Sequence, residues 1–155
     1  MGYKEQKQRQ FDTRYLQMAR VWAENSYCVR RKVGALIVKD NMIISDGYNG
    51  TPAGFENICE DDMGKTKPYV LHAEANAIIA AAREQMIGAD LYMACTDPAD
   101  GSIVPNTCSC MMCKRQVINA GIARVIVREN KNDYTVYDVE DWVQNDDSLS
   151  GKFGY

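Results

Sequence analysis

Residues 71–78 read Leu-His-Ala-Glu-Ala-Asn-Ala-Ile, and residues 110–113 read Cys-Met-Met-Cys. His72 is the only histidine among 155 residues, so any chemistry that requires an imidazole must use it. A histidine and two cysteines can bind a zinc ion, and a glutamate beside the metal can move protons. We therefore interpret the rest of the chain as the scaffold that brings these two segments together.

The residues before this stretch predict a helix and a β-hairpin. Apolar side chains recur at helical spacing from Asp12 to about Ser26, after a charged, frayed lead-in over residues 1–10. The run Val33–Val38 is apolar and rich in β-branched residues, which favours a strand. A turn at Lys39–Asn41 leads into a second strand at Met42–Ile44.

The later elements alternate between helix and strand, and two irregular stretches, 47–68 and 96–107, separate some of them. We expect a helix from Tyr69 to about Gln85, a strand at Leu91–Cys95, a helix from about Cys110 to Ala120 and strands at Val125–Val127 and Tyr134–Tyr137. This alternation predicts an α/β sandwich in which both crossovers are right-handed and join parallel strands.

Composition predicts one soluble domain over residues 1–155. No apolar run reaches the roughly 20 residues of a membrane helix, and the polar start excludes a secretory signal peptide, so we expect a cytoplasmic location. Lys and Arg number 18 against 21 Asp and Glu, a net charge of −3, which argues against long nucleic acid as a partner. A small anionic substrate fits, because one or two arginines suffice for a single phosphate.

The cysteine content has two explanations. The six cysteines are Cys28, Cys59, Cys95, Cys108, Cys110 and Cys113. A disulfide framework is one explanation, but the chain length, the polar start and the clustering at 108–113 argue against it. We expect two of the six to bind metal and the others to be buried thiols.

The spacing of the candidate ligands indicates a catalytic metal site. Cys110 and Cys113 lie one helical turn apart and can reach the same ion, and with His72 they leave a fourth tetrahedral position open for water. Glu74 would take a proton from that water and return it to the substrate. A closed structural zinc site completed by Cys108, a non-catalytic zinc module and a thiol redox pair are the alternatives. A structural site does not need Glu74, and a redox pair does not need His72.

Four segments carry a resemblance that extends beyond the metal motif and covers roughly residues 12–128. They are Arg30–Asp40, Gly47–Pro52, Pro68–Ile78 and Cys110–Ile122. Together they resemble the cytidine and deoxycytidylate deaminase superfamily, most closely its deoxycytidylate (dCMP) branch. The resemblance implies a three-layer α/β/α sandwich around a five-stranded mixed sheet. It also implies zinc as the cofactor, His72, Cys110 and Cys113 as its ligands, and Glu74 as the proton shuttle.

The same resemblance implies a substrate site and a reaction. Asn49 would contact the sugar or base, the Ala73 backbone N–H would read the pyrimidine edge, and Arg30 would bind the 5′-phosphate. Without the resemblance, Arg30 belongs to a solvated basic patch and Asn49 to a turn. The expected reaction is hydrolysis of dCMP to dUMP and ammonia by a homo-oligomer, often a hexamer in this family, some members of which respond to dCTP and dTTP. Deamination of cytidine, guanine or a tRNA adenine is the nearest alternative.

Three features depart from the family pattern. Ser109 stands where the family usually has proline, and we expect it to cap the following helix instead. The approach over residues 97–107 is longer than usual, and the tail after Arg128 resembles no family segment. These departures bear on the exact substrate more than on the reaction.

Overall fold

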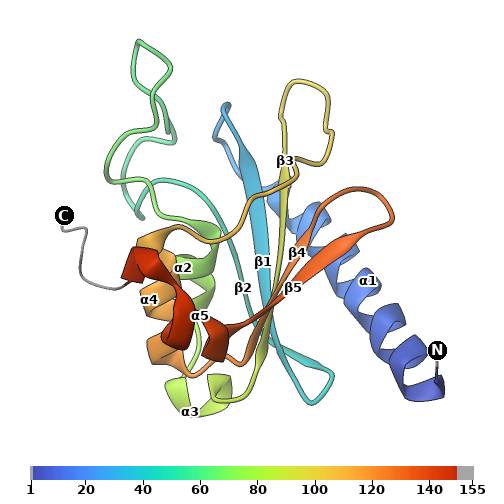
Figure 1. Cartoon of the computed structure of the whole chain (residues 1–155). Helices are drawn as coiled ribbons and strands as arrows, with labels where there is room; N and C mark the ends of the chain where they lie inside the picture. Colours follow the sequence, from blue (N-terminus) through green and yellow to red (C-terminus); the bar gives the residue numbers. More distant parts are fainter. Residues whose placement is uncertain (1, 150–155) are drawn as a thin grey trace.

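Apolar runs form the centre of a five-stranded sheet. The structure, a computed structural model, describes residues 2–149 (Figure 1). The strands follow the spatial order β2-β1-β3-β4-β5. Their bounds are β1 Lys32–Lys39, β2 Met42–Tyr48, β3 Asp90–Thr96, β4 Arg124–Arg128 and β5 Tyr134–Asp138. The central strands β1, β3 and β4 are almost wholly buried, because both faces of the sheet are covered there.

The pairing makes the sheet mixed, as predicted. β1 is antiparallel to both β2 and β3, β3 is parallel to β4, and β4 is antiparallel to β5. Since β1 lies between β2 and β3 and opposes both, those two strands run in the same direction. Both crossovers therefore join strands of equal direction, which confirms the parallel arrangement expected from the alternation of helix and strand.

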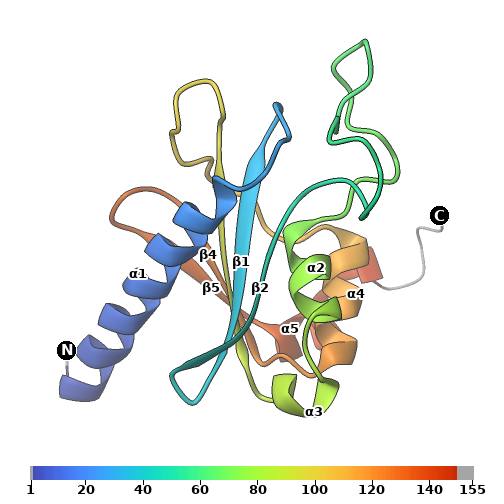
Figure 2. The same ribbon diagram turned by 180° about the vertical axis from the view of Figure 1, so that it is seen from behind.

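Helices cover the two faces of the sheet unequally. α1 (Tyr3–Ala23) lies alone on one face, and the other helices lie on the opposite face (Figures 1 and 2). Those helices are α2 Ala73–Ile79, α3 Arg83–Met86, α4 Met111–Ala120 and α5 Val139–Asn145. A buried apolar cluster fills each interface. The three-layer α/β/α sandwich is thus confirmed, with a single helix as one outer layer.

The first helix is longer than its apolar pattern indicates. The expected frayed lead-in over residues 1–10 is wrong, because α1 begins at Tyr3 and ends at Ala23. Residues 3–10 are exposed on every side, so no apolar stripe marks them as helical. They contain neither glycine nor proline and consist mainly of good helix formers, which accounts for their helical conformation.

The helix expected from Tyr69 to Gln85 is two shorter helices, α2 and α3, so its predicted bounds are wrong. Upstream of α2, the backbones of Gly50 and Leu71 exchange two hydrogen bonds, of 3.1 and 2.8 Å. These bonds keep the chain extended up to His72, which becomes the residue before the first helical turn. The high alanine content of this segment gave no signal for either boundary.

The tail after Arg128 is described by the structure through residue 149. It forms the predicted strand β5, followed by α5 and a short 3₁₀ turn at Asp147–Leu149, neither of which was predicted. Val139 and Trp142 are the buried residues of α5, and two apolar positions in seven residues are too few to reveal a helical period.

Two helices lie directly against strand backbone. Gly47, predicted to be in a loop, belongs to β2, and a β-carbon there would lie 2.5 Å from the carbonyl oxygen of Ala73 and 2.6 Å from the nitrogen of Ala77. On the other face, a β-carbon on Gly34 would overlap the carbonyl oxygen of Ala19 in α1. Only glycine permits this close approach of helix to strand.

One expectation about the cysteines is wrong. Cys28 and Cys59 form a disulfide across a sequence separation of 31 residues, so they are not buried thiols. The bond attaches the irregular segment after β2 to the entry of β1. Chain length and composition argued for reduced cysteines, whereas the pairing depends on how the chain folds back. Between residues 2 and 149, no helix is long and apolar enough to cross a membrane.

Candidate metal centre and substrate pocket

Side-chain and backbone contacts fix the helix that carries His72 and Glu74. The hydroxyl of Ser45 donates to the carbonyl of Ala77 at 2.6 Å, and the Asn76 amide donates to the carbonyl of Tyr48 at 2.8 Å. Both bonds join α2 to β2. The start of α2 is therefore held at a fixed place over the sheet.

The second ligand-bearing helix begins after a long loop. Residues 97–107 leave the end of β3, and the loop is tied back where the Val104 nitrogen donates to the Cys95 carbonyl at 2.9 Å and the Asn106 nitrogen donates to the Glu129 carboxylate at 2.8 Å. Cys110 then precedes the first residue of α4. Ser109 does not cap this helix as expected, because its buried hydroxyl has no hydrogen-bond partner within residues 2–149.

The structure brings His72, Cys110 and Cys113 together. The Nδ1 atom of His72 lies 3.3 Å from the sulfur of Cys113 and 3.4 Å from that of Cys110, and the three ligand atoms all lie within 4.8 Å of one another. Tetrahedral zinc with usual bond lengths would separate a nitrogen and a sulfur ligand by about 3.6 Å. The donor set and its spacing therefore fit a zinc ion with little adjustment.

The protonation pattern of the three side chains is consistent with a metal site. Hydrogen bonds from the Cys113 thiol and from His72 lower the pKa of Cys110 to about 3. The Cys110 thiolate raises the pKa of Cys113 and that of His72. The three side chains are thus coupled through the Cys110 sulfur, and a metal ion bound there would take the place of the shared protons.

The ligand group opens on one side. His72 and Cys110 are exposed while Cys113 is buried, so the open side faces solvent. Within residues 2–149, no fourth histidine, cysteine or acidic side chain joins the group. Cys108 lies outside it, and burial raises the pKa of its thiol. This arrangement disfavours the closed structural site that Cys108 would have completed.

A pocket of about 600 Å³ adjoins the ligand group. Its walls include His72, Ala73, Glu74 and Cys110. Glu74 is only 4 % exposed, so this lining residue is shielded from bulk solvent. The pocket therefore joins a metal-binding group, a shielded carboxylate and the backbone at the start of α2.

Two adjacent arginines line the same pocket, of which we predicted only Arg30. Arg31 lies 3.7 Å from the carboxylate of Asp97, whereas Arg30 forms no ion pair within residues 2–149. Arg30 is therefore the cation with its charge available to a ligand. The sequence offered no signal to separate the two arginines, because Asp97 belongs to a distant loop.

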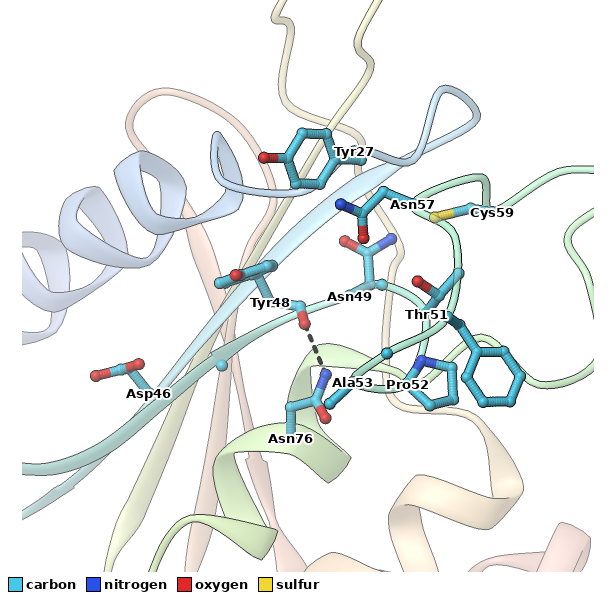
Figure 3. Close-up of a pocket in the computed structure, with 14 residues that line it drawn as sticks. Tyr27, Asp46, Tyr48, Asn49, Thr51, Pro52, Ala53, Asn57, Cys59 and Asn76 are labelled. Carbon is cyan, nitrogen blue, oxygen red and sulfur yellow. Dashed lines mark hydrogen bonds between the residues drawn. The ribbon is translucent and has the colours of Figure 1, made fainter.

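Asn49 lines the pocket and also clamps the start of β1. Its side-chain oxygen accepts from the Val33 nitrogen at 2.8 Å, and its amide donates to the Arg31 carbonyl at 2.9 Å. Asn49 also borders a neighbouring pocket of about 400 Å³ formed by the loop after β2 (Figure 3). If Asn49 contacts the substrate as expected, it does so with an amide group that already forms these two backbone hydrogen bonds.

A protein-family model and several known proteins match this chain. The model of the cytidine and deoxycytidylate deaminase zinc-binding region matches residues 9–129. The deoxycytidylate deaminase of Mycobacterium phage D29 is 33% identical over 130 residues, covering 75% of this chain and 92% of that protein. That of Schizosaccharomyces pombe is 32% identical over 133 residues, covering 79% of this chain, but this chain spans only 38% of the yeast protein.

Solved structures agree with the sequence comparison. The dCMP deaminase of cyanophage S-TIM5, crystallised with dCMP and dUMP, matches with a TM-score of 0.65 and 31% identity, covering 97% of this chain and 93% of that one. The cytidine deaminase of Burkholderia pseudomallei has a TM-score of 0.55 at 19% identity, covering 81% of this chain and 91% of that one. The latter likeness concerns the fold alone.

Proposed function

The chain belongs to the cytidine and deoxycytidylate deaminase family, and from this premise we propose that it hydrolyses dCMP to dUMP and ammonia. The observation that carries the proposal is the open three-ligand group beside the buried carboxylate of Glu74. The likeness to a phage enzyme crystallised with dCMP and dUMP supports this choice of substrate.

His72, Cys110 and Cys113 would hold the zinc ion, and their mutual distances suit a tetrahedral site. A bound zinc ion would supply Lewis acidity, which makes water a competent nucleophile near neutral pH. His72 and Cys110 each precede the first turn of a helix. The N-terminal end of α4 would favour the thiolate form of its cysteines, which is the form that binds zinc.

Glu74 would move the protons of the reaction. Its carboxylate would accept one proton from the attacking water and deliver it to N3 of the cytosine ring. It would then take the second proton of that water, which is carried by the new hydroxyl group on C4, and pass it to the amino group, which leaves as ammonia. Its burial would keep bulk water away from these transfers. Ala73 lines the same pocket, and its backbone N–H would bind the pyrimidine edge.

Arg30 would select a phosphorylated substrate. It lines the pocket, and its guanidinium is not engaged by a carboxylate within residues 2–149. Charge-assisted hydrogen bonds to a 5′-phosphate would satisfy it. Asn49, already fixed by two backbone bonds, would present the remaining surface of its amide to the sugar.

We further propose that residues 1–155 act as one deaminase domain and that the protein is a homo-oligomer. Large apolar side chains in the loop after β2, Phe55 and Met63 among them, are exposed and suit contacts between subunits. Sedimentation velocity would test the assembly. The proposed location is the cytoplasm, where nucleoside monophosphates are found.

The test is ammonia release from dCMP, CMP, dCTP, deoxycytidine, cytosine, guanine and a tRNA. We expect turnover of dCMP by the wild type, and at least a thousandfold loss in Glu74→Gln with the zinc content unchanged. Glu84→Gln, on the exposed surface of α3, is the matched control. Equal activity of Glu74→Gln and wild type would refute the proton-transfer role of Glu74. Activity that is confined to unphosphorylated bases would refute dCMP as the substrate.

A further inference from the structure

A pocket of about 410 Å³ lies on the α1 side of the sheet, away from the candidate metal centre. Its lining residues come from the C-terminal half of α1, the tip of the 97–107 loop, the end of β4 and the turn between β4 and β5. Three of its lining side chains are cations, Arg20, Arg128 and Lys131, and none is acidic. We refer to it as the basic pocket.

Arg128 is a buried cation in the basic pocket. It is 7% exposed, and its Nε and one terminal nitrogen donate to the carbonyls of Asn130 and Lys131 at 3.1 and 3.2 Å. No carboxylate lies within 4 Å of it in residues 2–149. Burial and the charge of Arg20 lower its pKa. Nearly buried charges are usually paired, so this guanidinium lacks the anion expected beside it.

Arg20 adds a second charge with no anionic partner. One of its terminal nitrogens donates to the carbonyl of Gly101 at 3.3 Å, and no carboxylate among the described residues pairs with it. Lys131, exposed at the rim, adds a third charge. The pocket thus concentrates three positive charges in a chain whose net charge is −3.

The acidic side chains of the surrounding segments are engaged elsewhere. Asp97 lies beside Arg31 and accepts from the Ala99 nitrogen. Asp100 accepts from the Ser102 nitrogen, and Glu129 accepts from Asn106 and Thr135. None of them neutralises the basic pocket, so its charges are available to a ligand.

We propose that the basic pocket binds a phosphate group of a small anionic ligand. Arginine offers a planar set of donors that matches phosphate oxygens, and only two of the five N–H groups of Arg128 are used within its own turn. Arg20 and Lys131 complete the neutralisation of a dianion. The pocket volume leaves room for more of the ligand than the phosphate itself.

This site is independent of the proposed deaminase activity, and it contacts a segment that leads to the metal centre. Gly101, Ser102 and Ile103 line the basic pocket, and the same loop continues to Cys110. A phosphate bridging Arg20 and Arg128 would join α1 to the β4–β5 turn next to the loop. Occupancy should therefore slow backbone hydrogen exchange at residues 100–104.

The experiment is calorimetric titration with inorganic phosphate, using Arg30→Gln protein so that the substrate pocket does not contribute. We expect one site, weakened at least tenfold by adding Arg20→Gln or Lys131→Ala and unchanged by adding Arg14→Gln, a control on the exposed face of α1. Hydrogen exchange at residues 100–104 should slow only in the phosphate-binding proteins.

Arg128→Gln should weaken phosphate binding as well. If this buried substitution prevents folding, Arg20→Gln and Lys131→Ala decide the outcome. The proposal is overturned if Arg30→Gln protein binds no phosphate. It is equally overturned if Arg20→Gln and Lys131→Ala bind phosphate as tightly as Arg14→Gln does.

Discussion

The carboxylate of Asp12 accepts a hydrogen bond from the buried hydroxyl of Tyr92, across the contact between α1 and the central strand β3. Asp12 is 2% exposed, and it also accepts from Tyr134 at 3.2 Å and lies 3.5 Å from Arg124. One carboxylate from the helix thus satisfies donors from three neighbouring strands. The packing of α1 on the sheet depends on it.

Asp12→Ala should destabilise the protein by about 3 kcal/mol, because it leaves the Tyr92 hydroxyl buried without its partner and Arg124 with only Asp90. Urea unfolding followed by circular dichroism measures the change. Tyr134→Phe, which removes one partly buried bond, should cost about 1 kcal/mol and serves as the comparison. Equal effects of the two substitutions would contradict the conclusion that the packing of α1 on the sheet depends on Asp12.

Gly47→Ala should destabilise the protein by more than about 2 kcal/mol, since the added methyl group would strike the backbone of α2. Because α2 follows His72 directly, the same change should weaken zinc binding, measured by competition with a chromophoric chelator. Gly50→Ala is the control, as a β-carbon there meets no atom within 4 Å. A normal zinc affinity in folded Gly47→Ala protein would show that the helix start tolerates displacement.

Reduction of the Cys28–Cys59 bond should lower the free energy of unfolding by about 3.7 kcal/mol, the chain-entropy estimate for a separation of 31 residues. Thermal melts with and without tris(carboxyethyl)phosphine measure it. The double variant Cys28→Ser/Cys59→Ser should melt at the temperature of the reduced wild type and should not respond to the reductant. A reductant effect that persists in the double variant would place its cause elsewhere.

Asp146→Asn should cost about 1 kcal/mol at pH 7. The Lys114 ammonium lies 2.6 Å from the Asp146 carboxylate, both side chains are less than one-fifth exposed, and the ion pair joins α4 to the end of α5. The hydrogen bond from Lys114, followed by that from Ser148, lowers the pKa of Asp146. A depressed carboxyl pKa stabilises the fold above the unfolded value near 3.9, and this contribution is lost as pH falls through the folded value.

The stability difference between wild type and Asp146→Asn should therefore be constant from pH 7 to about pH 5 and should shrink at lower pH. Urea unfolding across that range provides the measurement. Asp62→Asn, at an exposed position, should show no such difference. A difference that grows on acidification would have the wrong sign for this ion pair.

Arg30→Gln should raise the KM for dCMP at least tenfold while leaving kcat/KM for deoxycytidine unchanged, because only the phosphorylated substrate uses the guanidinium. Arg31→Gln should have a smaller effect, since Arg31 already lies beside Asp97. Steady-state kinetics on both substrates make the comparison. Equal losses on the two substrates would assign Arg30 a structural role instead.

Much of the sheet could be predicted from the sequence, because central strands are short apolar runs between turn formers. The convergence of His72 and the two cysteines was also predictable, since ligand type and spacing specify the site chemically.

What the sequence could not reveal depends on tertiary contacts. The first turns of α1 carry no apolar stripe, and the pairing of Gly50 with Leu71 decides where α2 begins. The Cys28–Cys59 bond and the partner of Arg31 both join residues from distant segments. Such contacts leave no periodic pattern in the chain.

The two glycine contacts lie at neighbouring positions of the β1–β2 ladder, where Gly34 pairs with Tyr48 and Ala35 pairs with Gly47. Main-chain atoms alone therefore set the spacing between α1 and α2 at this level of the sheet. We therefore expect the height of His72 above the strands to depend on these backbone contacts more than on the size of core side chains elsewhere. The two glycines thus hold α1 and α2 at backbone-contact distance from the sheet on its two faces, and they fix the level at which the candidate ligand His72 lies.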